Sequence, residues 1–146
     1  MKISDILKMP VVWLVSLLVY LGMIFAVSNI PAMDLLVIRF PNWDKFAHFF
    51  EYLPVGFMVT GLLSSKFPGS RPAVLIPAVI AISLLLGGLD EFHQSFVPGR
   101  DVSLGDAIAD VLGATVGAML AVHFMKAAAY RTGATGALQA ESKRQQ

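Results

Sequence analysis

The sequence contains no cysteine among its 146 residues. A disulfide, a thiolate ligand for zinc and a cysteine nucleophile are therefore excluded. Charged residues are scarce as well, at 14% of the chain against about 25% in a typical soluble domain. The net charge of +1 offers no basic footprint for a nucleic-acid partner. Hydrophobic residues make up 56% of the chain, so we expect a protein that is solvated by lipid.

Four segments with little or no charge are each long enough to cross a bilayer, at about 11–30, 45–63, 73–89 and 104–125. About 20 helical residues, rising about 1.5 Å each, span a hydrocarbon core of about 30 Å. The first segment is longer than the apolar part of a signal peptide, so we expect an uncleaved helix. The sequence therefore predicts an all-α membrane bundle of four transmembrane helices at 1–126, followed by a disordered cytoplasmic tail at 127–146.

Lysine and arginine are distributed unevenly between the two ends of these spans. The N-terminus, the loop at 64–72 and the C-terminus hold eight of the 11, whereas the other end holds Arg39, Lys45 and Arg100. Cytoplasmic segments are enriched in these residues, so we expect both termini in the cytoplasm. The two remaining loops then lie together at the outer surface, which brings two polar patches to the same face of the membrane.

The first polar patch lies at the start of the second span. At about 100° per residue, Asp44, His48 and Glu51 share one face of a helix, with Tyr52 beside them. Acids on both sides of a histidine can fix its tautomer. Ionisable groups this far inside a span usually face the bundle interior and are functional. The simpler interpretation is a capped helix start whose polar groups pair with a nearby cation.

The second polar patch, Asp90, Glu91 and Gln94, follows the third span. If the helix continues, Asp90 and Gln94 share a face at positions i and i+4. Paired acids can act as general acid and base, or ligate a divalent cation. A solvated acidic helix end explains the patch less well, because the helix dipole is negative there.

A Pro98-Gly99 turn leads from this patch into the fourth span. Ser103 is a candidate N-cap, with Asp106 three residues later in a variant of the capping box. Arg100 can clamp a phosphate or a carboxylate, or neutralise the neighbouring acids. Asp110 lies deep enough in the span to need a buried partner. The candidate partners are His48, His93 and Arg100.

These residues define the expected site. The candidate catalytic residues are His48, Glu51, Asp90 and Glu91. The expected binding cluster comprises Asp44, His48, Tyr52, Asp90, Glu91, Gln94, Arg100, Ser103, Asp106 and Asp110. No spacing matches a metal motif such as His-Glu-x-x-His, so the sequence predicts no metal site, and no cofactor is clearly implied. A metal site that draws on the histidines and acids of the two patches stays an open alternative; its candidate ligands are His48, Glu51, Asp90, Glu91, His93, Asp106 and Asp110. No Gly-x-Ser-x-Gly elbow supports a serine nucleophile.

Small residues recur every four positions in the fourth span, at Gly105, Ala109, Gly113 and Gly117. Such a ridge lets a neighbouring helix backbone approach closely. We expect it to pack a helix of the bundle, and it can also serve as the surface for a helix of another protein.

Two segments resemble the motifs of the VanZ-like family of small bacterial membrane proteins. Residues 44–56, DKFAHFFEYLPVG, are similar to D-K-x-x-H-F-x-x-Y-x-x-L-G, with Val55 in place of the leucine. Residues 90–106, DEFHQSFVPGRDVSLGD, follow D-E-x-x-Q-x-F-x-P-x-R-x-x-S-x-x-D throughout. The resemblance covers about 10–125, and the family often has asparagine at the position of Asp110.

The resemblance implies a small helical bundle in the cytoplasmic membrane. The family is named for an accessory protein that lowers teicoplanin susceptibility, which implies a role at the cell envelope. We expect a binding or accessory role toward an anionic lipid-linked or cell-wall precursor, or toward the glycopeptide itself. Two alternatives stay open: an intramembrane enzyme acting on a lipid head group, and a structural subunit of a membrane complex.

Overall fold

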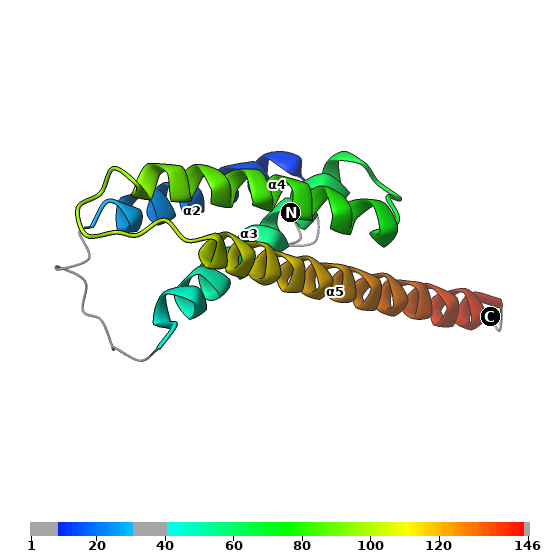
Figure 1. Ribbon diagram of the computed structural model, residues 1–146. Helices are drawn as coiled ribbons and strands as arrows, with labels where there is room; N and C mark the ends of the chain where they lie inside the picture. The colour runs from blue at the N-terminus through cyan, green and yellow to red at the C-terminus, as the bar shows by residue number, and fades with distance from the viewer. Residues whose placement is uncertain (1–8, 31–40, 145–146) are drawn as a thin grey trace.

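The computed structural model describes residues 9–30 and 41–144, with side chains as far as residue 128. It contains the helices α2 (Pro10–Ser28), α3 (Trp43–Lys66), α4 (Pro72–Gln94) and α5 (Leu104–Arg144), shown in Figure 1. Each helix has a stretch that is long and apolar enough to cross a membrane, and that of α5 ends at Ala128. The expected all-α membrane fold with four spans is confirmed.

The helix boundaries follow from local chemistry. Pro10 and Pro72 begin α2 and α4, where the missing N–H has no intrahelical partner to lose. Gly69 and Gly99 have φ of 84° and 77° in the two loops that join α3 to α4 and α4 to α5, a backbone region that favours glycine. α4 continues to Gln94 rather than ending near 89, so the second polar patch is part of the helix.

The C-terminal segment is helical as far as residue 144, where the sequence predicted a disordered tail at 127–146; residues 145–146 lie outside the described part of the chain. α5 continues as a helix from the end of its apolar span at Ala128 to Arg144. Figure 1 shows this part projecting beyond the other three helices. The segment is rich in alanine, which has the highest helix propensity, and extending a helix costs less than starting one. The lack of apolar periodicity therefore did not indicate a disordered backbone in this segment.

The small-residue ridge of α5 packs against α3. A Cβ on Gly113 or Gly117 would overlap the carbonyl oxygen of Phe49 or Leu53, respectively, and a Cβ on Gly56 would overlap the backbone of Ala114. The two backbones are thus in direct contact, which only glycine permits. The ridge is occupied within the chain, so the expected surface for a helix of another protein is not available at these glycines.

α3 is the central helix, since it packs most extensively against α5 and also contacts α2 and α4. From α2, the indole of Trp13 lies over Gly61 and its ring centroid is 6.0 Å from that of Phe57. Side chains buried between the helices form the apolar core; they include Leu17, Ile24, Tyr52, Val55, Val59, Val79, Ala114 and Ala118. This core fixes the helices beneath the polar end of the bundle.

Candidate functional site

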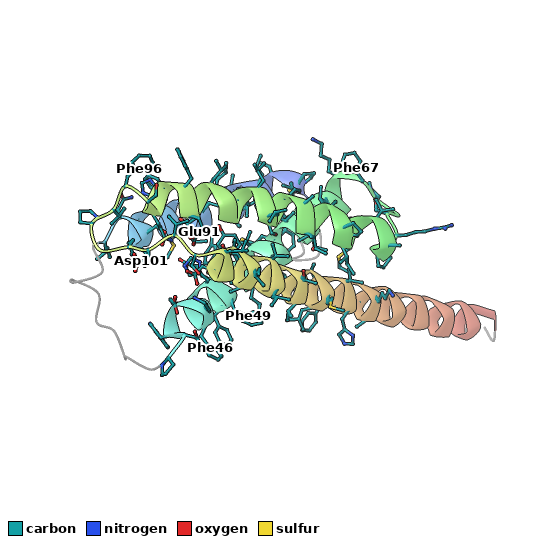
Figure 2. All side chains as sticks on the ribbon, in the orientation of Figure 1. Phe46, Phe49, Phe67, Glu91, Phe96 and Asp101 are labelled. Carbon is teal, nitrogen blue, oxygen red and sulfur yellow. The ribbon has the colours of Figure 1, made fainter. Side chains whose placement is uncertain are left out.

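The polar residues converge where α2 and α4 end and where α3 and α5 begin, at one end of the bundle (Figure 1). Figure 2 shows Glu91 at this end, on the side of α4 that faces the start of α5, with Phe67 at the opposite end. The buried polar residues here are Ser28, His48, Asp90, Glu91, Gln94, Asp106 and Asp110. The expectation that the two polar patches form one cluster therefore holds in the structure.

His48 is the centre of the cluster and is only 5% exposed. Its Nδ1 is 3.0 Å from Oδ1 of Asp110, which is completely buried. Of the three candidate partners for Asp110, the structure selects His48. An ionised carboxylate only accepts hydrogen bonds, so with Asp110 ionised Nδ1 of His48 is the donor. When the imidazole is neutral, Nε2 then keeps its lone pair.

Nε2 of His48 faces the carboxylate of Glu91. The distance from Nε2 to Oε1 of Glu91 is 3.9 Å, which is too long for a hydrogen bond. Oε1 is buried and has no hydrogen-bond partner among the residues that the structure describes. A buried acceptor without a partner costs free energy, about 1–3 kcal/mol and more for a charged group. The two atoms thus face each other across a gap that a proton donor or an ion can bridge.

The other oxygen of Glu91 is tied to the loop before α5. Oε2 accepts a hydrogen bond of 2.8 Å from the backbone N–H of Ser103. Ser103 is the N-cap, as its sequence position predicts, and its Oγ accepts the N–H of Gly105 at 3.1 Å. The expected reciprocal bond from Asp106 is wrong, because Glu91 of another helix takes that place. The capping arrangement therefore joins α4 to α5.

Asp106 turns instead toward α3. Its Oδ1 is 3.2 Å from Nζ of Lys45, which also lies 2.9 Å from Asp44 and 3.5 Å from Oγ of Ser103. The side chain of Lys45 is 34% exposed and that of Asp106 is 5% exposed. Lys45 was not among the predicted site residues. Its position directly after Asp44, at the start of the first polar patch, was the available signal.

Asp90 and Gln94, both on α4, belong to the same cluster as His48 and form a hydrogen bond with each other. Nε2 of Gln94 donates to Oδ2 of Asp90 at 2.8 Å, which confirms the expected i, i+4 pairing. Ser28 of α2 donates its hydroxyl to Oδ1 of Asp90 at 2.8 Å. Ser28 was not among the predicted site residues, because a single hydroxyl at the end of an apolar run gives no pattern.

Arg100 does not contact the acids with which it was expected to pair. Its guanidinium donates to the carbonyls of Ile30 and Val27, at 3.3 and 3.5 Å. Within residues 9–30 and 41–128 it makes no ion pair with a carboxylate. It thus satisfies carbonyls at the C-terminus of α2, where the helix dipole favours a cation. The expected neutralisation of Asp90 or Glu91 by Arg100 is wrong.

The other residues that the sequence singled out at this end are Tyr52, Glu51 and His93. Tyr52 is 1% exposed, and the backbone carbonyl of Glu51 accepts the hydroxyl of Tyr20 at 3.1 Å. The ring of His93 stacks on Phe25 with centroids 4.3 Å apart. His93, unlike His48, has no contact with the acids of the cluster among those that the structure gives.

One group of donor atoms has the composition of a cation site. One donor atom each from His48, Glu91 and Asp106 lie within 4.8 Å of one another. The three residues come from α3, α4 and α5, and all three are buried. An imidazole with two carboxylates is a donor set that transition-metal ions accept.

The fold and this cluster define a multi-pass membrane protein with a buried histidine–carboxylate centre at one end of four helices. The family model described as VanZ/LLP1 matches residues 6–126. The chain therefore belongs to the VanZ/LLP1 family, as its two motifs indicated. Comparison with curated proteins gives no match, and comparison with solved structures gives none either.

Proposed function

We propose that this protein is an intramembrane enzyme that performs acid–base chemistry on the head group of a lipid or a lipid-linked cell-wall precursor. The observation that carries the proposal is the setting of His48. Asp110 holds Nδ1 at 3.0 Å, and Nε2 faces Glu91 across 3.9 Å. A carboxylate that orients a histidine and stabilises its protonated form is the arrangement found in general-base catalysis.

In this proposal His48 accepts a proton through Nε2 from a hydroxyl or a water that enters the gap before Glu91. Asp110 keeps the imidazole in the required tautomer and stabilises the positive charge that develops. General acid–base catalysis of this kind contributes about 10²- to 10⁴-fold to a rate. Glu91 is oriented for its part by the N–H of Ser103.

The position of the cluster supports a substrate at the membrane surface. The cluster lies at an end of the bundle whose outer side chains are apolar and exposed, among them Phe92, Phe96 and Leu104. Lys45, at 34% exposure, is the cation nearest the surface of the cluster and suits the phosphate of a head group. The distribution of lysine and arginine supports an outward orientation of this end.

The second candidate is the binding or accessory role toward an anionic precursor or a glycopeptide. The exposure of Lys45 favours it. Two observations count against it: Arg100 is engaged by backbone carbonyls, and the groups that surround His48 are mainly carboxylates. The third candidate, a structural subunit, loses its expected surface because α3 occupies the glycine ridge.

The test compares envelope lipids from a susceptible host that expresses the wild type, His48→Gln or His93→Gln. His93 is the matched control, because it lies at the same end but stacks on Phe25. We expect mass spectrometry to find a lipid species gained or depleted with the wild type and with His93→Gln, but not with His48→Gln. Equal amounts of membrane-inserted protein are verified by immunoblot.

The alternatives give different outcomes in the same strains. Lipids identical to those of the empty host would contradict the enzyme. A lipid that co-purifies with the wild type and is lost in Lys45→Ala, without any change in the lipid pool, would support the binding role. The family resemblance adds one expectation, that the wild type lowers teicoplanin susceptibility and that His48→Gln does not.

A further inference from the structure

The donor atoms of His48, Glu91 and Asp106 form a small buried group. One atom of each lies within 4.8 Å of the others, and the residues are 5%, 5% and 4% exposed. Ligands at about 2.1 Å from one ion stand at most about 4.2 Å apart. The separations of the three donors are at most 4.8 Å, and that between Nε2 of His48 and Oε1 of Glu91 is 3.9 Å. Small side-chain rotations therefore suffice to bring all three to one ion.

Groups behind the donors hold two of them in place. Asp110 fixes Nδ1 of His48, so that Nε2 points at Glu91. This pairing is the carboxylate–histidine arrangement that orients metal-bound imidazoles. The N–H of Ser103 holds Oε2 of Glu91. Its Oε1 is left buried, without a hydrogen-bond partner among the described residues, and aimed at Nε2.

The charge of the group points to a cation. Glu91, Asp106 and Asp110 are three buried carboxylates, whereas Lys45 is the one lysine or arginine that the described part of the chain pairs with any of them. Buried carboxylates without a counter-charge are strongly disfavoured. A divalent ion between Nε2 and Oε1 would supply that charge.

We propose that His48, Glu91 and Asp106 bind a divalent transition-metal ion, Zn²⁺ or Mn²⁺. Imidazole with carboxylates suits these ions, whereas Mg²⁺ and Ca²⁺ prefer oxygen ligands alone. Three protein ligands leave a coordination position open, as in catalytic sites. The inference deepens the proposed function, on which any catalytic use of the ion rests. If the ion is bound, Nε2 of His48 would be one of its ligands rather than the proton acceptor, and the ion would supply an activated water in its place.

This site departs from the expectation of no metal that the sequence supports. Metal motifs such as His-Glu-x-x-His place two ligands one turn apart on one helix. Here each of α3, α4 and α5 supplies one ligand, so no local spacing records the site. Only the packing of the three helix ends brings the donors together.

The experiment uses the full chain, purified in detergent with a tag that contains no histidine and stripped with a chelator. Zn²⁺ is titrated in, with Mg²⁺ in a parallel titration, and bound metal is measured by calorimetry and by elemental mass spectrometry. We expect about one Zn²⁺ per chain, little binding of Mg²⁺, and a zinc absorption-edge spectrum with one imidazole ligand.

Variants separate the site from adventitious binding. Glu91→Gln and Asp106→Asn are expected to weaken Zn²⁺ binding more than about tenfold, since changes even in outer-shell partners cost about 10- to 100-fold. Asp90→Asn and His93→Gln are the matched controls, because they are a neighbouring acid and a neighbouring histidine outside the donor group. Both controls are expected to bind as the wild type does.

The results distinguish this inference from the proposed function. No stoichiometric Zn²⁺ or Mn²⁺ in the wild type would overturn the metal site, as would equal binding by Glu91→Gln, Asp106→Asn and the wild type. The wild-type absorption spectrum does not depend on any variant folding. Tight binding without a lipid difference in the strains would refute the enzyme but leave the metal site standing. A lipid difference in the strains, together with no stoichiometric metal in the purified wild type, would refute the metal site but leave the enzyme standing.

Discussion

At the scale of the residue, the position of Asp110 depends on the absence of a side chain at Gly87. A Cβ at Gly87 would stand 2.6 Å from Oδ2 and 3.2 Å from Cβ of Asp110. Asp110 is fully buried and bonded to His48, so it cannot rotate away without breaking that contact. Gly87 on α4 thus helps to set the direction in which the imidazole on α3 points.

Gly87→Ala is therefore expected to displace Asp110 and to destabilise the protein by about 1–3 kcal/mol, the usual cost of overpacking. Gly88→Ala, on the same helix, is its matched control, since a Cβ at Gly88 meets no atom within 4 Å. The control should be neutral or slightly stabilising, within about 1 kcal/mol. Thermal unfolding in detergent measures both. Equal unfolding temperatures for Gly87→Ala and Gly88→Ala would show that Asp110 is not confined as described.

At the scale of the element, the bundle depends on the contact between α3 and α5. Gly117 lies against the carbonyl of Leu53, which belongs to the backbone and cannot move aside as a flexible side chain can. We expect Gly117→Ala to separate the two helices, at the upper end of the overpacking cost of about 1–3 kcal/mol or beyond it. Because His48 is on α3 and Asp110 on α5, the hydrogen bond between these two residues should be broken too.

Gly22→Ala in α2 is the control for this change, because a Cβ at Gly22 meets no atom within 4 Å. Size-exclusion profiles and unfolding temperatures of detergent-solubilised protein compare the two variants with the wild type. If Gly117→Ala is as stable as Gly22→Ala, the ridge does not pack α3 in the way that the structure places it.

At the scale of the whole molecule, the sequence predicts the spans and the meeting of the two polar patches, because run length and helical period determine both. It cannot predict partners across helices. Arg100 was expected among carboxylates, but the carbonyls at the end of α2 lie nearer. Ser28 and Lys45 enter the cluster only through tertiary packing. The helix at 127–144 was not predicted either, because it extends the transmembrane part of α5 and has no apolar pattern of its own.

The orientation of the molecule is the remaining prediction at this scale, and the lack of native cysteine makes it easy to measure. Asp101, exposed in the loop between α4 and α5, and Ser70, in the loop between α3 and α4, lie at opposite ends of the bundle. Because eight of the 11 lysines and arginines lie on the Ser70 side in the four-span arrangement, that side should be cytoplasmic. A membrane-impermeant maleimide applied to intact cells should therefore label Asp101→Cys, and should label Ser70→Cys only after permeabilisation.

The reverse pattern would place the His48 centre at the cytoplasmic surface, and its substrate would then be a lipid or precursor of the inner leaflet. Labelling at both positions in intact cells would mean a mixed orientation, in which lysine and arginine do not decide the topology of this chain.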